Sequence, residues 1–378
     1  MTGTEPIYLD HNATTPVDPR VVEAALPYLT DHFGNPSSGH AHGRRAATAL
    51  AGARAAVAEL VDAAAPDEIV FTSGGSEADT LAVVGAVLGR GGRGHVITQV
   101  TEHPAVLAAC AALARWHDVR VTHLGVDGTG LVDPAELTTA LTPDTVLVSI
   151  MHANNETGTV QPVAELAALA HAHGALFHTD ASQTAGKIGV SVRGLGVDLL
   201  TVTGHKMYAP KGIGALYVRT KLELEPVVPG GGQERGRRAG TENVALAVAL
   251  GAAARLADPG AAHRQRRPRD LLHDRLAATL PGRVRLNGHP TLRLPNTLNV
   301  SVDGVGGDEL LAATPEVAAA TGSACHEGDP RPSPVLTAMG LSAARARSAL
   351  RLTVGRWTRE ADVERAARLL AGAAAGVR

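Results

Sequence analysis

The feature that most constrains the fold is an alternation of short β-rich runs with helical patterns between about residue 66 and residue 220. Strands separated by helices pair side by side and in parallel, and the helices cover both faces of the sheet. We therefore expect an α/β fold with a mainly parallel sheet. The expected strands are residues 69–72, 95–98, 119–124, 146–151, 175–179, 199–202 and 215–218. The expected helices are residues 76–88, 104–116 and 162–173, the last two opening with proline at the first helical position.

A second, smaller α/β domain is expected, because 378 residues exceed what one hydrophobic core usually serves. The glycine-rich stretch 229–243 is either a plain connector or a loop that binds an anion or a partner. A helical stretch then runs through Asp258-Pro259-Gly260 and the basic cluster 264–269 to residue 280, and the domain change is placed there. New strands are expected at 284–286, 297–302 and 349–353. The expected division is a large domain at 17–261 and a small domain made of 1–16 and 262–378.

The composition excludes several classes of protein. A formal net charge of -2 gives no global field that would attract nucleic acid or an anionic membrane. Two cysteines, Cys110 and Cys325, are too few for a disulfide framework or a four-thiolate zinc site. The first residues lack the pattern of a signal peptide, and the longest uncharged apolar run, 244–254, is too short to span a bilayer. We expect a cytoplasmic protein.

Three strand ends carry residues with chemical potential. Residues 69–78 combine a strand, a tight turn at Gly74-Gly75 and the start of a helix, which favours an anion site at the helix N-terminus; the alternative is a plain turn capped by Ser76. Asp180 stands at the end of a buried strand, where it either holds a protonated pyridine nitrogen or caps a helix. Lys206 ends another strand and can act as a nucleophile toward aldehydes, with Lys211 as the rival lysine.

A phosphate cradle, an acid for a ring nitrogen and a Schiff-base lysine together predict a pyridoxal 5'-phosphate site. The chain also resembles the cysteine desulfurases of pyridoxal-phosphate fold type I, over nearly its whole length. This family has a large domain with a mainly parallel seven-stranded sheet and a smaller α/β domain. The matching motifs are Tyr8-Leu9-Asp10-His11-Asn12-Ala13-Thr14-Thr15-Pro16, Gly34-Asn35-Pro36-Ser37-Ser38, Thr101-Glu102-His103-Pro104, Met151-His152-Ala153-Asn154-Asn155-Glu156-Thr157-Gly158, Gly204-His205-Lys206, Arg238-Ala239-Gly240-Thr241 and Gly322-Ser323-Ala324-Cys325.

The resemblance implies roles for individual residues. His103 would stack on the cofactor ring and shuttle a proton, which suits a chain with only 2% aromatic residues. Asn155 and Gln183 would hydrogen-bond the phenolic oxygen of the ring. The residues implied to hold the phosphate are Gly75, Ser76, Thr203, His205 and, from a second subunit of a homodimer, Thr241. The family usually has threonine at position 76 and serine at position 203. This chain has Ser76 and Thr203 instead, and both keep the hydroxyl group.

The substrate carboxylate would be held by Arg351 and Asn35, with Arg356 as the nearest competitor of Arg351. Cys325 lies in a small, polar loop of the length found in the long-loop desulfurases, whereas Cys110 lies in an apolar helical pattern typical of a buried thiol. The implied reaction frees L-alanine from L-cysteine while the Cys325 thiolate takes the sulfur as a persulfide and passes it to an acceptor protein.

Other interpretations remain at this stage. An aminotransferase or kynureninase-type lyase explains everything except Cys325, and a non-catalytic relative would not need Lys206, Asp180, His103 and Cys325 together. Ala324-Cys325-His326 and the stretch 332–336 also resemble selenocysteine lyases. A metal site at His40 and His42, or at His171 and His173, is disfavoured because alternate residues on a helix point apart and no third ligand is evident. The sulfur acceptor cannot be named from the sequence; an iron–sulfur scaffold, a thiolation enzyme and a sulfur carrier all fit.

Overall fold

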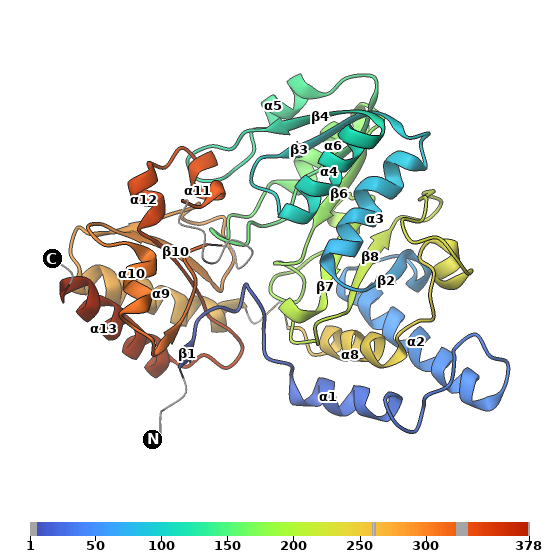
Figure 1. The fold of residues 1–378 in the computed structure, drawn as a ribbon, viewed down its shortest axis with the longest axis horizontal. Coiled ribbons are helices and arrows are strands. Elements are labelled where there is room, and N and C mark those ends of the chain that lie inside the picture. Colours follow the sequence, from blue (N-terminus) through green and yellow to red (C-terminus); the bar gives the residue numbers. More distant parts are fainter. Residues whose placement is uncertain (1–5, 259, 261, 323–331, 377–378) are drawn as a thin grey trace.

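The computed structural model describes residues 6–258, 260, 262–322 and 332–376, and it confirms the expected α/β fold (Figure 1). A seven-stranded sheet has the order β2-β8-β7-β6-β5-β3-β4, and all neighbours are parallel except β8, which is antiparallel to both of its partners. Every strand expected here is present, with shifts of at most two residues at the ends. The strands are β2 (Ile69–Thr72), β3 (Arg93–Gln99), β4 (Asp118–Leu124), β5 (Thr145–Ser149), β6 (Leu176–Asp180), β7 (Leu199–Thr203) and β8 (Gly214–Val218).

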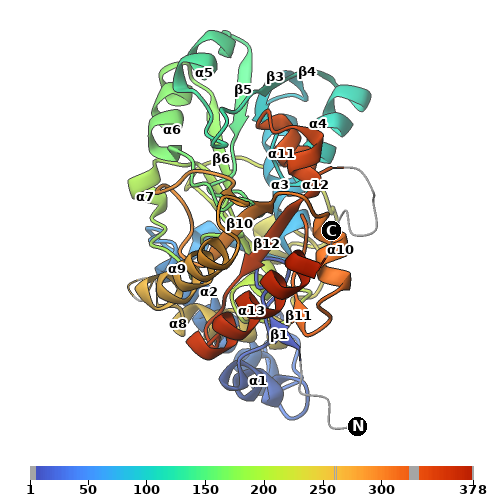
Figure 2. The same cartoon turned by 90° about the vertical axis from the view of Figure 1, so that its left-hand side faces the viewer.

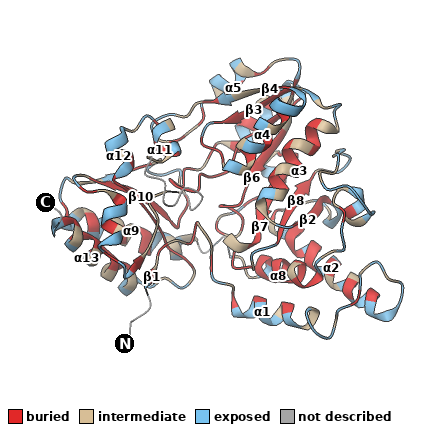
Figure 3. Ribbon diagram, viewed as in Figure 1, coloured by how far each residue is buried: buried red, intermediate tan, exposed pale blue. Residues whose placement is uncertain are grey.

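Helices cover both faces of this sheet, because successive side chains of a strand point to opposite faces and both sets are apolar. On β7, Leu200 packs with the helices of one face while Leu199 packs with those of the other. The strands and the helix sides that face them are buried (Figure 3). One face is covered by α3 (Gly75–Leu88) and α4 (Pro104–Trp116). The other is covered by α1 (Pro19–Ala25), α2 (Ala41–Leu60), α5 (Pro134–Ala140), α6 (Val163–Ala172), α7 (Val192–Leu195) and α8 (Val244–Arg255).

A second core forms around an antiparallel sheet of order β12-β10-β9 (Figure 2). Its strands match the three expected from the sequence: β9 (Val284–Leu286), β10 (Thr297–Val302) and β12 (Ala349–Thr353). The N-terminal strand β1 (Ile7–Tyr8) pairs in parallel with β11 (Val317–Ala318), so both ends of the chain join this core. The helices of this core are α9 (Ala262–Thr279), α10 (Gly307–Ala312) and α13 (Glu360–Gly376), while α11 (Pro334–Ala338) and α12 (Ala343–Arg347) form a small apolar cluster next to β12. The expected domain boundaries stay a prediction.

Two expectations about helices are wrong. The helical stretch expected through residue 258 is two helices, since α8 ends at Arg255 and α9 begins at Ala262. Asp258 lies in neither helix, in agreement with the preference of a residue before proline for a non-helical conformation. Pro162 is the N-cap of α6 and not its first helical residue. Short 3-10 turns are present as well: η1 (Leu26–Tyr28), η2 (Pro66–Glu68), η3 (Gly204–Lys206) and η4 (Gln233–Gly236). No helix in the described ranges is both long and apolar enough to cross a membrane.

Candidate active site

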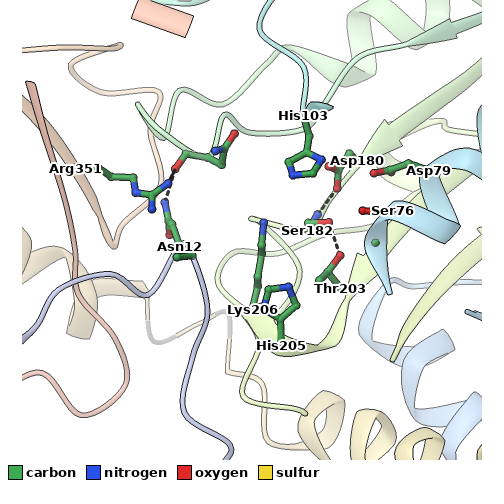
Figure 4. Close-up of a pocket in the computed structure, with 13 residues that line it drawn as sticks. Asn12, Ser76, Asp79, His103, Asp180, Ser182, Thr203, His205, Lys206 and Arg351 are labelled. Carbon is green, nitrogen blue, oxygen red and sulfur yellow. Dashed lines mark hydrogen bonds between the residues drawn. The ribbon is translucent and has the colours of Figure 1, made fainter. Parts of the chain in front are cut away.

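A pocket of about 220 Å³ lies at the carboxyl ends of β6 and β7 (Figure 4). Most of its wall comes from the seven-stranded sheet and its helices, and Arg351 of β12 closes it from the other core. Ligands of open α/β sheets bind at this edge of the strands. The lining residues are Asn12, Ala13, Gly75, Ser76, Asp79, His103, Asn155, Asp180, Ser182, Thr203, His205, Lys206 and Arg351.

Strand alternation brings the polar residues of β6 and β7 to one face. Phe177 of β6 and Val202 of β7 pack in the core on the far side of the sheet, so Asp180 and Thr203 point toward the α3 side. Ser182 joins them: its backbone N–H donates to Asp180 Oδ1 at 2.8 Å, and its Oγ lies 2.6 Å from Thr203 Oγ1. The acid and the hydroxyl groups are thus held by the sheet and not by a loose loop.

The N-terminus of α3 forms the floor of an anion cradle. Gly74 has φ +152°, a conformation that favours glycine, and a Cβ on Gly75 would collide with Thr203 Oγ1. The first turn of this 14-residue helix therefore approaches Thr203 without a side chain in between. Its open backbone N–H groups, its dipole and the Ser76 hydroxyl favour a bound anion such as a phosphate.

The 3-10 turn η3 places Lys206 at the end of β7, in the wall of the pocket. His205 beside it is fixed by the N-terminal segment, since its carbonyl accepts from the backbone N–H of Thr15 at 2.9 Å and its Nδ1 lies 3.1 Å from Thr14 Oγ1. Burial, and then the neighbouring Lys206 charge, lower the pKa of His205 to about 4. His205 is therefore neutral at pH 7 and can donate or accept a hydrogen bond.

His103 is the N-cap of α4 and lines the pocket. Its Nδ1 accepts the backbone N–H of Ala105 at 3.1 Å, so the neutral ring carries its proton on Nε2. The ring stands beside Asp180 in Figure 4. This placement suits a ring that covers a flat ligand and transfers a proton through Nε2.

Two further buried carboxyl groups surround Asp180. Glu102 accepts from the backbone N–H of Met151, and burial followed by the charge of Asp180 raises its pKa to about 8. Asp79, from α3, lines the pocket, and burial followed by the same charge raises its pKa far above the usual range. Since neighbouring carboxylates in a buried site cannot all ionise, we interpret Asp79 and Glu102 as neutral at pH 7.

Arg351 crosses from β12 and is almost fully buried. Its Nη2 donates to Asp10 Oδ1 at 2.7 Å, and its Nη1 lies 3.5 Å from the carbonyl oxygen of Asn155. Among the described residues, Arg351 Nε has no hydrogen-bond partner. A buried guanidinium with an unused donor in a pocket wall is suited to bind a carboxylate.

Not all expected site residues reach this pocket. Gln183 is buried and does not line it, although its Nε2 donates to the carbonyl oxygen of Asn12, which does; Asn35 and Thr241 are exposed and outside the pocket of their own chain. Cys325 lies outside the described residues. The competitor Arg356 pairs with Asp18 at 2.5 Å and points elsewhere. No group of three potential metal ligands occurs among the residues that could be searched, those with a described position.

Four lining residues were not expected from the sequence: Asn12, Ala13, Asp79 and Ser182. Asp79 follows Ser76 by three residues on α3, a spacing that puts both on one face of the helix, so it could have been found from that spacing. Asn12 stands inside a motif already noted, but only the fold shows that the N-terminal segment reaches the pocket.

The residues present fit pyridoxal 5'-phosphate. The glycine floor that a Cβ would fill matches the phosphate, Asp180 matches a pyridinium nitrogen, and Lys206 lies in the same wall for the aldehyde. The buried thiol Cys110 is not part of this site; burial, then the charge of Glu102, raise its pKa to about 12. An inert thiol agrees with the structural role expected for it.

Known proteins with the same features are similar along nearly the whole chain. Residues 7–366 match the family described as Aminotransferase class-V. A cysteine desulfurase of Gluconacetobacter diazotrophicus is 46% identical over 377 residues, which cover 98% of this chain and 94% of that protein. A solved structure titled "NIFS-LIKE PROTEIN" superposes with a TM-score of 0.89 at 32% identity, covering 97% of this chain and 98% of that one. A second, titled "SspA in complex with cysteine", has a TM-score of 0.82 at 38% identity, with 92% and 98% covered.

Proposed function

The chain belongs to the cysteine desulfurases of the class-V aminotransferase family, and on that premise we propose which of its residues perform each part of the reaction. The enzyme depends on pyridoxal 5'-phosphate and takes the sulfur of L-cysteine, leaving L-alanine. The Gluconacetobacter diazotrophicus relative is a cysteine desulfurase, so desulfuration of cysteine is the activity that the similarity supports.

The cofactor, when bound, supplies a protonated ring that draws electrons away from the substrate Cα. The N-terminus of α3, Ser76, Thr203 and His205 would bind its phosphate, and Asp180 would hold the ring nitrogen in its protonated form. His103 would cover the ring, and Lys206 would bind the cofactor covalently through Nζ. Asn155 and Gln183 would hydrogen-bond the phenolic oxygen.

Arg351 orients the substrate by its carboxylate, since it is the buried guanidinium in the pocket wall. The substrate amine would replace Lys206 in its bond to the cofactor, and the freed Nζ of Lys206 would then remove the Cα proton. His103 Nε2 is the second group that can deliver a proton, and Cβ needs one after sulfur departs.

Cys325 is the proposed sulfur acceptor within the enzyme. Its thiolate attacks the substrate sulfur, the new S–S bond forms as the Cβ–Sγ bond breaks, and the electron pair of that bond stays with the carbon fragment that is protonated to alanine. The persulfide then carries the sulfur to an acceptor protein.

A homodimer would complete the site, and we place the enzyme in the cytoplasm. Thr241 is exposed, and its loop is anchored by Arg238, whose Nε donates to Glu77 Oε1 of α3 at 2.7 Å. Exposed Leu29 and Phe33 add apolar surface nearer the N-terminus, which suits contact with a second copy. A protein that is monomeric and fully active at high dilution would contradict the dimer.

The observation that carries this proposal is the convergence of Lys206, Asp180, the α3 N-terminus and Arg351 on one pocket. The test is a single turnover with L-cysteine and no acceptor. One alanine per active site should appear together with one persulfide on the enzyme. Alanine without bound sulfur, or formed only when an oxoacid is added, would contradict it.

A further inference from the structure

Lys187 is a buried lysine directly behind the active-site pocket. Only four lysines occur in the chain, and this one is 6% exposed. Its Nζ donates to Gln183 Oε1 at 2.8 Å and lies 3.3 Å from Asn12 Oδ1. Both partners are neutral amide oxygens. Burial, and after it the charges of Lys206 and Arg351, lower the pKa of Lys187 well below its usual range.

These contacts fix the orientation of the Gln183 amide. Without them the amide could flip and exchange the positions of its oxygen and nitrogen. The oxygen accepts from Lys187, and the nitrogen donates to the carbonyl oxygen of Asn12 at 3.0 Å. An amide nitrogen carries two hydrogens, and the bond to Asn12 uses one of them. Gln183 follows Ser182 and contacts Asn12, both of which line the pocket, so its second N–H is the donor left for a ligand oxygen. If the amide were reversed, Lys187 would face an NH₂ group and the donor would be lost.

Asn12 is oriented by the same amine. Its Oδ1 accepts from Lys187 and from Asn296 Nδ2 at 2.9 Å, and its Nδ2 donates to the Asn155 carbonyl oxygen and to Thr297 Oγ1. Asn12 thereby links the N-terminal segment, the seven-stranded sheet and β10 at the pocket wall. Removing the Lys187 amine would take the donor from the buried Gln183 Oε1 and leave Asn12 Oδ1 with Asn296 Nδ2 alone.

We propose that Lys187 is a positioning residue of this active site, which acts through Gln183 by presenting the amide nitrogen as a donor to the phenolic oxygen of the cofactor. The inference rests on the proposed function, because that function assigns the phenolic oxygen to Gln183. Lys187 itself is not in the pocket wall and does not touch the reacting atoms.

The test compares four holoenzymes: wild type, Lys187→Met, Gln183→Met and the double variant. The readouts are the pH titration of the cofactor absorbance, the cofactor dissociation constant and the thermal midpoint. Each single variant should weaken cofactor binding by roughly tenfold and shift the absorbance titration, as expected for a buried hydrogen bond left unmade. The double variant should be no worse than either single variant, because two residues that act in series are not additive.

Lys221→Met is the matched control, since Lys221 is exposed, and it should behave as wild type. Should Lys187→Met not fold, Lys187→Gln carries the same test, because its shorter side chain cannot keep both bonds and should give the same shift. A Lys187 variant with a lower thermal midpoint but a wild-type absorbance titration would overturn the inference, as would additive losses in the double variant. If Gln183→Met also leaves the absorbance titration unchanged, the role of Gln183 in the proposed function fails, and the inference fails with it.

Discussion

Arg351 and Asp10, 341 residues apart in the chain, form an ion pair with 2.7 Å between Nη2 and Oδ1. Arg351 is 1% exposed, so this pair keeps a guanidinium charge stable inside the protein until a substrate carboxylate arrives. Arg351 also lines the pocket, so the same guanidinium can meet that carboxylate. The pair explains how the second core can present a cation to a pocket built mainly by the first.

Replacing Arg351 by alanine should raise the KM for L-cysteine by roughly 100-fold, since truncating one partner of a buried charge pair costs about 2–5 kcal/mol. Steady-state alanine production measures this. Arg356→Ala is the control: Arg356 pairs with Asp18 outside the pocket, so its loss should lower stability while KM stays within about twofold. Equal effects of both variants on KM would contradict the role of Arg351.

Replacing Lys206 by alanine should leave a folded protein that cannot bind the cofactor covalently. Borohydride reduction followed by mass determination should find the reduced cofactor attached to wild type and to Lys211→Ala, and not to Lys206→Ala. Lys211 is exposed and does not line the pocket, which makes it the matched control. Label on another lysine of the Lys206 variant would show that the assignment is wrong.

Glu102 predicts a dependence of stability on pH. Its pKa is raised to about 8 in the folded chain by burial and by Asp180, against 4.5 when unfolded, so between these values the folded state binds more protons. Glu102 therefore contributes stability that is fully present below about pH 4.5 and is lost as the pH rises toward about 8. Glu102→Gln removes the titration, so the wild type should lose stability relative to this variant across that window. A difference that does not change with pH would contradict the raised pKa.

The loop that carries Thr241 is held by a buried ion pair between Arg54 and Glu234. Arg54 donates from both Nη atoms to the Glu234 carboxylate, at 2.6 and 2.7 Å, and Glu234 also accepts from the backbone N–H of Phe71. Glu234→Ala should cost about 3–5 kcal/mol of unfolding free energy, because it leaves a buried charge unpaired. The exposed pair of Arg235 with Asp67 is the control, and Arg235→Ala should change stability by less than about 1 kcal/mol. Denaturant unfolding of both variants measures the contrast.

The sequence could predict the elements that depend on local pattern. Strands β2, β9, β10 and β12 and helix α4 match their expected ranges. Local patterns mark them: an apolar run in β2, apolar residues alternating with polar ones in the other three strands, and a proline at the first helical position of α4. Lys206 and Asp180 could be placed at the pocket because each ends a strand of one parallel sheet.

Contacts between distant segments could not be predicted in this way. Nothing near Arg351 in the sequence indicates that Asp10 pairs with it, and the Gln183 amide is oriented by Lys187 and by the remote Asn12. The break between α8 and α9 was missed because apolar and basic periodicity continues on both sides of Asp258. Such features depend on how distant segments pack together, and local sequence patterns do not predict that packing.

Cys325 and Cys110 give the final prediction, since the chain has no other thiols. Cys110 is buried in α4 with a pKa raised to about 12, so at pH 8 almost none of it is thiolate, and it has no access to a substrate sulfur. With ³⁵S-labelled cysteine, wild type and Cys110→Ala should therefore both retain protein-bound sulfur that a reducing agent releases. Cys325→Ala should retain none and should lose at least about 100-fold in alanine formation, because a tethered thiolate supplies a large effective concentration that a free thiol cannot replace. The Cys325 variant should still show the cofactor absorbance and thermal midpoint of the wild type, which separates a lost nucleophile from a damaged fold. Alanine formed at the wild-type rate by Cys325→Ala would mean that sulfur leaves without attack by this thiol, and the persulfide role would have to be abandoned.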